Sequence, residues 1–174
     1  EVGFDSGEKP LLHVCAYVSF QELATRVSHR NTGRVTEDPV AEKLLIRVSK
    51  DENLHMIFYR NIVEAALQLA PGPTMRAITD EVVGFQMPGS VIPGFARKAV
   101  QMARAGIYDL RIHHDDVVWP LLRHWDFFGI EGLDERAEQR RTEVAQFLEV
   151  LDQTARRYDE KRARRAEREA AVSV

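Results

Sequence analysis

The sequence predicts an all-α protein, and two patterns lead to this prediction. Apolar residues recur at steps of three and four along most of the chain, which is the periodicity of helices that pack on a core. Alternating apolar stretches are too short for strands, and glycine and proline fall between the periodic segments. Because 44% of the 174 residues are hydrophobic and the formal net charge is −3, we expect a folded chain rather than a disordered one.

The elements follow in order from these patterns. Residues 1–10 are rich in glycine and charge and are predicted to be a linker. Asp38-Pro39 is a typical helix start, Pro71-Gly72-Pro73 is a stop, and Pro120 should kink or break the helix that contains it. We expect helices over residues 11–33, 39–70, 74–86, 94–105, 112–128 and 134–171.

The last of these helices changes character along its length. Its first half carries an apolar stripe, namely Val144, Phe147, Leu148, Leu151 and Tyr158. From Arg156 onward it is charged, with acid-before-base pairs four residues apart such as Asp152/Arg156, and is predicted to be solvated. The chain therefore divides into a linker (1–10), a helical bundle (11–133) and a long charged C-terminal helix (134–174).

Composition excludes several classes of function. No run of 18 apolar residues exists, so no transmembrane helix is expected. The near-neutral charge argues against a dedicated nucleic-acid binder, and no glycine-rich phosphate loop is present. The single cysteine, Cys15, cannot form an internal disulfide; we expect a buried, inert thiol and a reducing, cytoplasmic location.

Two of the predicted helices carry acid or imidazole groups on the face expected to meet the core. In residues 11–33 that face is Leu11, Val14, Val18, Glu22, Thr25 and His29. In residues 39–70 it is Leu45, Val48, Glu52, His55, Tyr59, Ile62, Ala66 and Leu69. If the two helices pack antiparallel, Glu22 and Glu52 come to a similar depth, with His55 one turn beyond Glu52.

A Glu on one helix followed by Glu-x-x-His on the next is half the ligand pattern of a di-iron carboxylate site. Such a site takes a Glu from each of two helices and a Glu-x-x-His from each of two others. Burial of an unpaired carboxylate is costly, so these residues are usually paired or bind a metal. A Glu–His–Glu hydrogen-bond cluster in a purely structural bundle explains the spacing equally well.

The local sequence resembles one family. Residues 17–34, YVSFQELATRVSHRNTGR, closely resemble the soluble acyl-acyl-carrier-protein desaturases of the stearoyl type, and residues 51–55, DENLH, look like the second Glu-x-x-His of that family. Residues 56–61, MIFYRN, and 85–89, FQMPG, look like its mycobacterial branch. The resemblance covers about residues 17–128, with both motifs in the family's order and spacing.

The resemblance implies a cytoplasmic homodimer with a ferritin-like bundle. Its di-iron centre would use dioxygen, and electrons from ferredoxin, to place a cis double bond in an acyl chain on acyl carrier protein. By resemblance Glu22, Glu52 and His55 are iron ligands. Thr25 matches a threonine on the dioxygen side of the iron pair, where its hydroxyl bonds oxygen or relays a proton. Asp51 matches an acid that orients the ligand histidine of the other helix pair.

The same resemblance places Val14, Cys15 and Val18 along the acyl tunnel. His29, two turns beyond Glu22, is expected to be a hydrogen-bonded core histidine behind the ligands rather than a ligand. The run His113-His114-Asp115-Asp116 is predicted to be a solvated helix start rather than a metal site, and His124 to be structural.

The family has a first half with its own Glu and Glu-x-x-His, and this chain contains no other Glu-x-x-His. The sequence therefore predicts the C-terminal half of a desaturase, inactive by itself. Two alternatives stay open, a non-catalytic helical interaction module derived from a desaturase half and another ferritin-like di-iron oxidase. A smaller alternative for the basic C-terminal run is a docking surface for acidic carrier protein.

Overall fold

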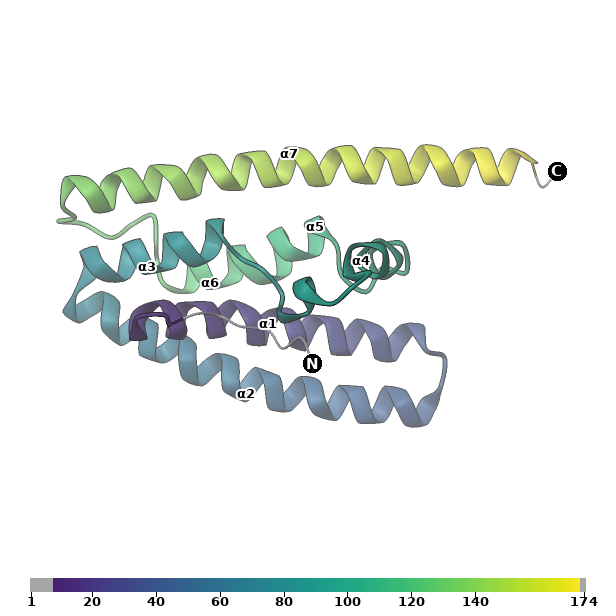
Figure 1. Ribbon diagram of the computed structural model, residues 1–174, viewed down its shortest axis with the longest axis horizontal. Helices are drawn as coiled ribbons and strands as arrows, with labels where there is room; N and C mark the ends of the chain where they lie inside the picture. The colour runs from purple at the N-terminus through teal and green to yellow at the C-terminus, as the bar shows by residue number, and fades with distance from the viewer. Residues whose placement is uncertain (1–7, 173–174) are drawn as a thin grey trace.

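The computed structural model describes residues 8–172, and its helices form three layers (Figure 1). An antiparallel pair, α1 and α2, forms one side; α3 and α6 lie in the middle; and α7 runs along the other side (Figure 1). The described residues contain no strand, so the all-α prediction is confirmed. The elements are α1 (Leu11–Val35), α2 (Pro39–Leu69), α3 (Pro71–Val83), η1 (Pro88–Val91), α4 (Phe95–Arg104), α5 (Leu110–Ile112), η2 (His113–Val118), α6 (Trp119–His124) and α7 (Glu135–Val172).

Local signals set the ends of the paired helices. The Asp38 side chain caps α2 by accepting hydrogen bonds from the N–H groups of Val40 and Ala41, at 2.8 and 3.2 Å, and Pro39 occupies the first turn. Pro71 ends α2 as expected but also begins α3, because its missing N–H is not needed in a first turn. The helix predicted for residues 74–86 therefore lies three residues earlier in the chain.

The helix predicted to contain Pro120 is interrupted on the N-terminal side of this proline. The helix predicted for residues 112–128 is three pieces, α5, the π-helical turn η2 and α6, which ends at His124. The N–H of Trp119 bonds to the carbonyl of His114, five residues back, and this wider turn places Pro120 in the first turn of α6, where no N–H is required.

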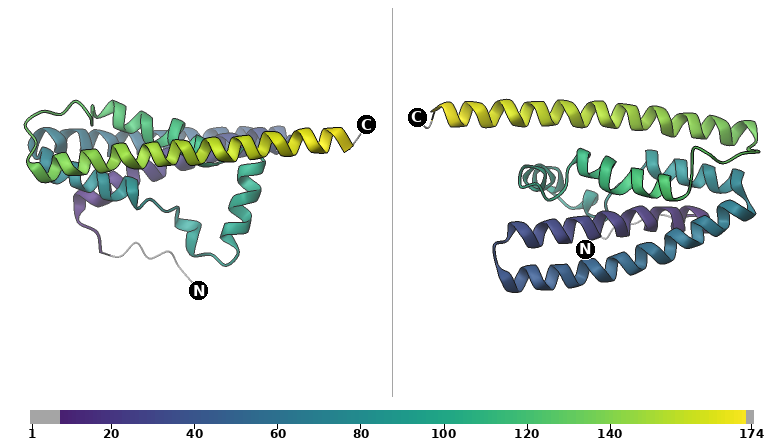
Figure 2. Two further views of the ribbon diagram at one scale, coloured as in Figure 1. Left: turned by 90° about the horizontal axis from the view of Figure 1, so that it is seen from above. Right: turned by 180° about the vertical axis from the view of Figure 1, so that it is seen from behind.

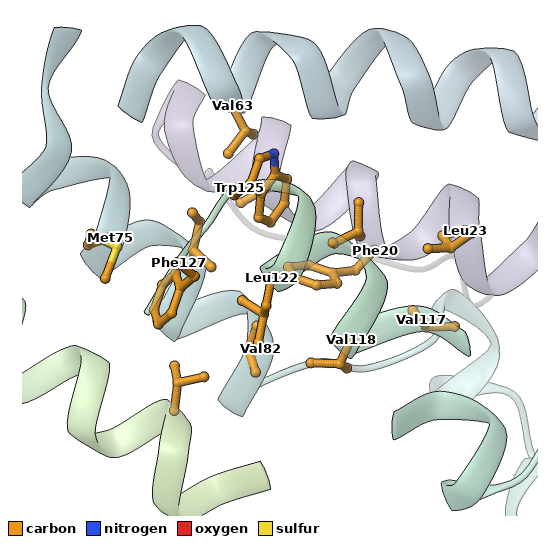
Figure 3. Packing of buried hydrophobic residues seen from close by; sticks show 14 of the residues in the cluster. Phe20, Leu23, Val63, Met75, Val82, Val117, Val118, Leu122, Trp125 and Phe127 are labelled. Carbon is orange, nitrogen blue, oxygen red and sulfur yellow. The ribbon is translucent and has the colours of Figure 1, made fainter. Parts of the chain in front are cut away.

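The core lies where α1, α3, η2, α6 and α7 meet (Figure 3). Phe20 of α1 meets Trp125 edge-on, with ring centroids 5.6 Å apart. Phe127, in the segment after α6, and Val144, on α7, are fully buried in the same cluster. Figure 3 shows Val63, Met75, Val82, Val118 and Leu122 around the same centre.

The buried stripes of α1 and α2 are not the predicted ones. Leu11 is 76% exposed and Leu69 is 87% exposed, although both were expected to face the core. The buried residues are Cys15, Ala16, Ser19, Phe20, Leu23, Ala24 and Gly33 in α1, and Ser49, Met56, Val63 and Leu67 in α2. Each stripe has helical spacing, so periodicity alone does not say which of two neighbouring faces the other helices cover.

The C-terminal helix α7 begins after Asp134, whose carboxylate accepts a hydrogen bond from the N–H of Ala137 at 2.7 Å. Its first half packs on the body, but Tyr158, predicted as part of the apolar stripe, is 62% exposed. Arg111 anchors the helix through a 2.6 Å ion pair with Asp152, which also pairs with Arg156. The end of α7 extends past the other helices (Figure 2).

The prediction of a solvated helix start was wrong for His113 and His114, which are buried, whereas Asp115 and Asp116 are exposed. The cap is Asp109, which accepts a hydrogen bond from the N–H of Ile112 at 2.9 Å. His113 stacks on Phe85 with ring centroids 5.0 Å apart, and its Nδ1 lies 2.8 Å from the hydroxyl of Tyr108. The charged neighbours in the sequence suggested that His113 faces water, but the rings of Phe85 and Tyr108 lie against it instead.

We predict that Phe20→Ala lowers the free energy of unfolding by about 3–5 kcal/mol, since it opens a cavity beside Trp125. The matched control is Phe58→Ala on α2, whose side chain is 61% exposed and whose truncation is expected to cost less than about 1 kcal/mol. Urea denaturation followed by circular dichroism measures both, and equal losses would contradict the core assignment.

We also predict that His113 destabilises the fold in acid. Burial, with the nearby His114 adding to it, lowers the pKa of His113 from 6.5 to about 4. The unfolded chain therefore binds one more proton between these values, and stability present above pH 6.5 is lost as the pH falls toward 4, by up to about 3 kcal/mol. His113→Gln should flatten the unfolding free energy between pH 6.5 and 4; an unchanged slope would contradict the prediction.

Candidate metal site

The antiparallel pair α1 and α2 brings three predicted ligands together. Glu22 comes from α1, Glu52 and His55 come from α2, and one ligand atom of each lies within 4.8 Å of the other two. His55 Nδ1 lies 3.4 Å from Glu22 Oε2 and 3.5 Å from Glu52 Oε2. The two carboxylates are mostly covered, with side chains 14% and 20% exposed, whereas that of His55 is 59% exposed.

The Glu22 carboxylate is in an unfavourable setting. Its Oε2 is buried and makes no well-formed hydrogen bond, although His55 Nδ1 lies 3.4 Å away. Burial, and then the hydrogen bond and charge of Glu52, raise the pKa of Glu22 to about 7, while His55 acts in the opposite direction. Within residues 8–172, neither carboxylate has an ion pair with lysine or arginine. Among the described residues, the ion-pair partners of the two carboxylates are therefore the imidazoles of His29 and His55, which are charged only when protonated.

These residues fit a metal ion. Two carboxylates and an imidazole are the oxygen and nitrogen donors that first-row divalent ions accept, iron included. A cation between them would satisfy the unpartnered Glu22 Oε2 and offset the repulsion between the carboxylates. The set is half of the ferritin-like di-iron pattern, one Glu and one Glu-x-x-His.

Thr25 and His29 lie beside this cluster on α1. The hydroxyl of Thr25 donates to the carbonyl oxygens of Gln21 and Glu22, at 3.1 and 3.0 Å, which is the backbone bonding that a helical threonine commonly makes. His29 Nε2 lies 3.6 Å from Glu52 Oε1, whereas His55 approaches Oε2 of the same carboxylate. Because this contact is longer than a hydrogen bond and the His29 side chain is 35% exposed, the prediction of a hydrogen-bonded core histidine was wrong.

The structure does not bring the remaining predicted residues into the cluster. Asp51 is exposed, and its carboxylate lies 3.7 Å from Arg47 on the same helix. Cys15 is part of the buried core, where burial raises the pKa of its thiol. Val14 is 37% exposed and Val18 is half-buried, so the three residues assigned to an acyl tunnel have different surroundings.

Sequence reasoning missed a groove of about 780 Å³ between α4 and α7. Residues 95–104 carried the signal, because their apolar residues recur at steps of four and their cations fall between them.

Within the part of the chain that the structure describes, no helix is both long and apolar enough to cross a membrane.

We predict that Glu22→Gln stabilises the metal-free protein at pH 8. Because the pKa of Glu22 is raised from 4.5 to about 7 on folding, stability is lost as the pH rises through this window, and the neutral amide should restore about 1–3 kcal/mol. Unfolding with chelator present, at pH 5 and pH 8, measures this. Glu64→Gln on the outer part of α2 is the control, with no pH-dependent gain. A Glu22→Gln protein less stable than wild type at pH 8 would contradict the prediction.

Comparisons with known proteins agree with the resemblance. A family model described as fatty acid desaturase matches residues 1–174. A Mycobacterium tuberculosis H37Rv protein named acyl-[acyl-carrier-protein] desaturase DesA1 is 44% identical over 176 residues, covering 97% of this chain and 52% of that protein. The rice chloroplast stearoyl-[acyl-carrier-protein] 9-desaturase 1 (Oryza sativa subsp. japonica) is 29% identical over 168 residues, covering 90% of this chain and 44% of that protein.

The fold has a counterpart among solved structures. The X-ray structure of a protein named acyl-ACP desaturase DesA2, from Mycobacterium tuberculosis H37Rv, superimposes with a TM-score of 0.66 and 22% identity. The superposition covers 76% of this chain and 53% of the DesA2 chain, and it supports a ferritin-like helical fold. The chain spans about half the length of the curated relatives it matches. With its full-length family match and its mycobacterial relative, the chain belongs to the fatty acid desaturase family.

Proposed function

We propose that these residues are the ligand-bearing C-terminal half of an acyl-[acyl-carrier-protein] desaturase. Glu22, Glu52 and His55 would supply half of a di-iron site, and a second Glu and Glu-x-x-His would come from two further helices. The observation that carries the proposal is the convergence of three donor atoms within 4.8 Å around a buried carboxylate oxygen that lacks a partner. By itself the described half-site is not expected to support turnover.

When bound, two iron ions would supply the activation of dioxygen that removes two hydrogen atoms from the acyl chain. The protein's own groups hold and orient the site. His29 lies 3.6 Å from Glu52 Oε1, where it would steady that carboxylate when protonated, and His55 faces both acids through Nδ1. Thr25 is one turn beyond Glu22 on the same helix face, so its hydroxyl oxygen is placed to accept a hydrogen bond from water at the site.

The proposed partners follow from the relatives' substrates and from the electrons that desaturation requires. The relatives are named for acyl-carrier-protein substrates, so we propose a saturated acyl chain on acyl carrier protein as the substrate. Reduction of dioxygen to water during removal of two hydrogens needs two more electrons, for which we propose ferredoxin. We further propose a homodimer in the cytoplasm, where the single buried thiol of Cys15 stays reduced.

Removal of one carboxylate tests the metal site. In the complete protein, Glu52→Gln is expected to lower Fe²⁺ affinity about a hundredfold or more and to abolish alkene formation, since both need the charged donor. Glu64→Gln, on the same helix but paired with His124 at 3.3 Å, is the matched control and should bind iron normally. Anaerobic reconstitution with metal analysis gives the affinity, and gas chromatography of released fatty acids detects alkene. Iron binding unaffected by Glu52→Gln would overturn the proposal, and a complete protein that neither binds iron nor forms alkene would favour the interaction module instead.

Thr25→Ala tests the second role at the site. We expect iron content to be retained and stability to change by only about 1 kcal/mol, while alkene formation falls about a hundredfold and oxygen is consumed without product. Thr32→Ala is the matched control, because its hydroxyl also donates to a backbone carbonyl of α1, that of Ser28 at 2.8 Å, two turns from the site. If both variants keep full turnover and coupling, the Thr25 hydroxyl serves only the helix backbone.

A further inference from the structure

A second hollow lies away from the carboxylate cluster. It has a volume of about 780 Å³, within the roughly 300–1,000 Å³ range of small-molecule sites, and we call it the α4–α7 groove. Residues 85–90, α4, residues 108–113 and the part of α7 from Ala155 to Arg165 line it. None of its lining residues belongs to α1 or α2, so it does not share walls with the Glu22 cluster.

The inner wall of the groove is apolar because of α4. Phe95, Ala99 and Ala103 follow one another at steps of four along this helix and all line the groove. No residue of α4 is fully buried, and Phe95, Ala99 and Ala103 are half-buried, so part of the apolar face of this helix stays exposed in the groove. The helix runs crosswise to α7 (Figure 2), which makes the hollow a slot beneath α7 rather than a flat patch.

The rim of the groove is cationic. Five basic side chains line it and only two acidic ones do, Asp109 and Asp159. Arg162 pairs with both acids, at 3.2 and 2.9 Å. Lys161 lies 5.8 Å from the ring centroid of Tyr158, and within the described chain neither Lys161 nor Arg104 has a carboxylate partner. Two cations thus remain to attract an anion at the groove's mouth.

We propose that the α4–α7 groove binds a long-chain fatty-acid anion. The alkyl chain would lie along Phe95, Ala99 and Ala103, where burial of apolar surface is favourable, and the carboxylate would meet Lys161 and Arg104. A single chain fits a slot walled by α4 and α7, whereas a lipid bilayer needs a flat open face. The proposal goes beyond the proposed desaturase function, because it uses none of the cluster residues.

Binding of cis-parinaric acid, a fluorescent fatty acid, to the complete protein tests this. Palmitate is expected to displace the probe, and hexadecanol, which has the same chain without the charge, to do so at least about tenfold less well. Equal displacement by both would overturn the role of the cationic rim. Flotation of the protein with phosphatidylglycerol vesicles, together with failure of palmitate to displace the probe, would replace the proposal with a membrane surface.

Matched variants locate the probe. Ala103→Trp fills the slot and should reduce probe affinity at least tenfold, whereas Ala96→Trp, exposed on the same helix outside the groove, should leave it unchanged. Lys161→Glu should weaken palmitate but not hexadecanol, with Arg164→Glu as its control. Probe affinity unaffected by Ala103→Trp would overturn the proposal.

The two proposals fail separately. Glu22→Gln should leave palmitate affinity unchanged, since Glu22 does not line the groove, and Ala103→Trp should leave iron content unchanged. Loss of palmitate binding in Glu22→Gln would place the fatty acid at the carboxylate cluster and overturn the groove assignment, whereas absence of iron alone would contradict only the desaturase.

Discussion

The antiparallel contact between α1 and α2 is the constraint on which the candidate site depends. Only three residues, 36–38, join the two helices, so they must run back along each other. The Asp38 cap sets where α2 begins and thereby sets its register against α1. That register places Glu22 opposite Glu52 and His55. A shift of one residue would rotate either partner by about 100° and separate the donors.

The cluster illustrates how a binding site opposes stability. Burial of the Glu22 carboxylate, and then the neighbouring Glu52, raise the pKa of Glu22 to about 7, while His55 acts in the opposite direction. A structural cluster of the same residues would be expected to satisfy its buried oxygens, but Glu22 Oε2 has no hydrogen-bond partner. This oxygen, which lies 3.4 Å from His55 Nδ1 without a well-formed hydrogen bond, is what a metal ion at the proposed site would bind.

The ligand face is also only partly covered. His55 is 59% exposed, and the faces of α1 and α2 that carry the donors lie beside the buried stripes rather than within them. A four-helix site closes such a face with two more helices. The proposed desaturase accounts for this exposure, because the chain spans about half the length of its curated relatives.

The helices, most of their ends and the three candidate donors could be predicted from the order of the residues alone. A capping aspartate, a proline in a first turn, or Glu-x-x-His on one helix face acts within a few residues of the chain. Which faces of α1 and α2 are buried, the enclosure of His113 by Phe85 and Tyr108, and the groove between α4 and α7 became evident only in the folded structure. Each of these depends on segments distant in sequence or on the path of the chain between helices, and helical periodicity specifies which residues share a face without specifying what that face will meet.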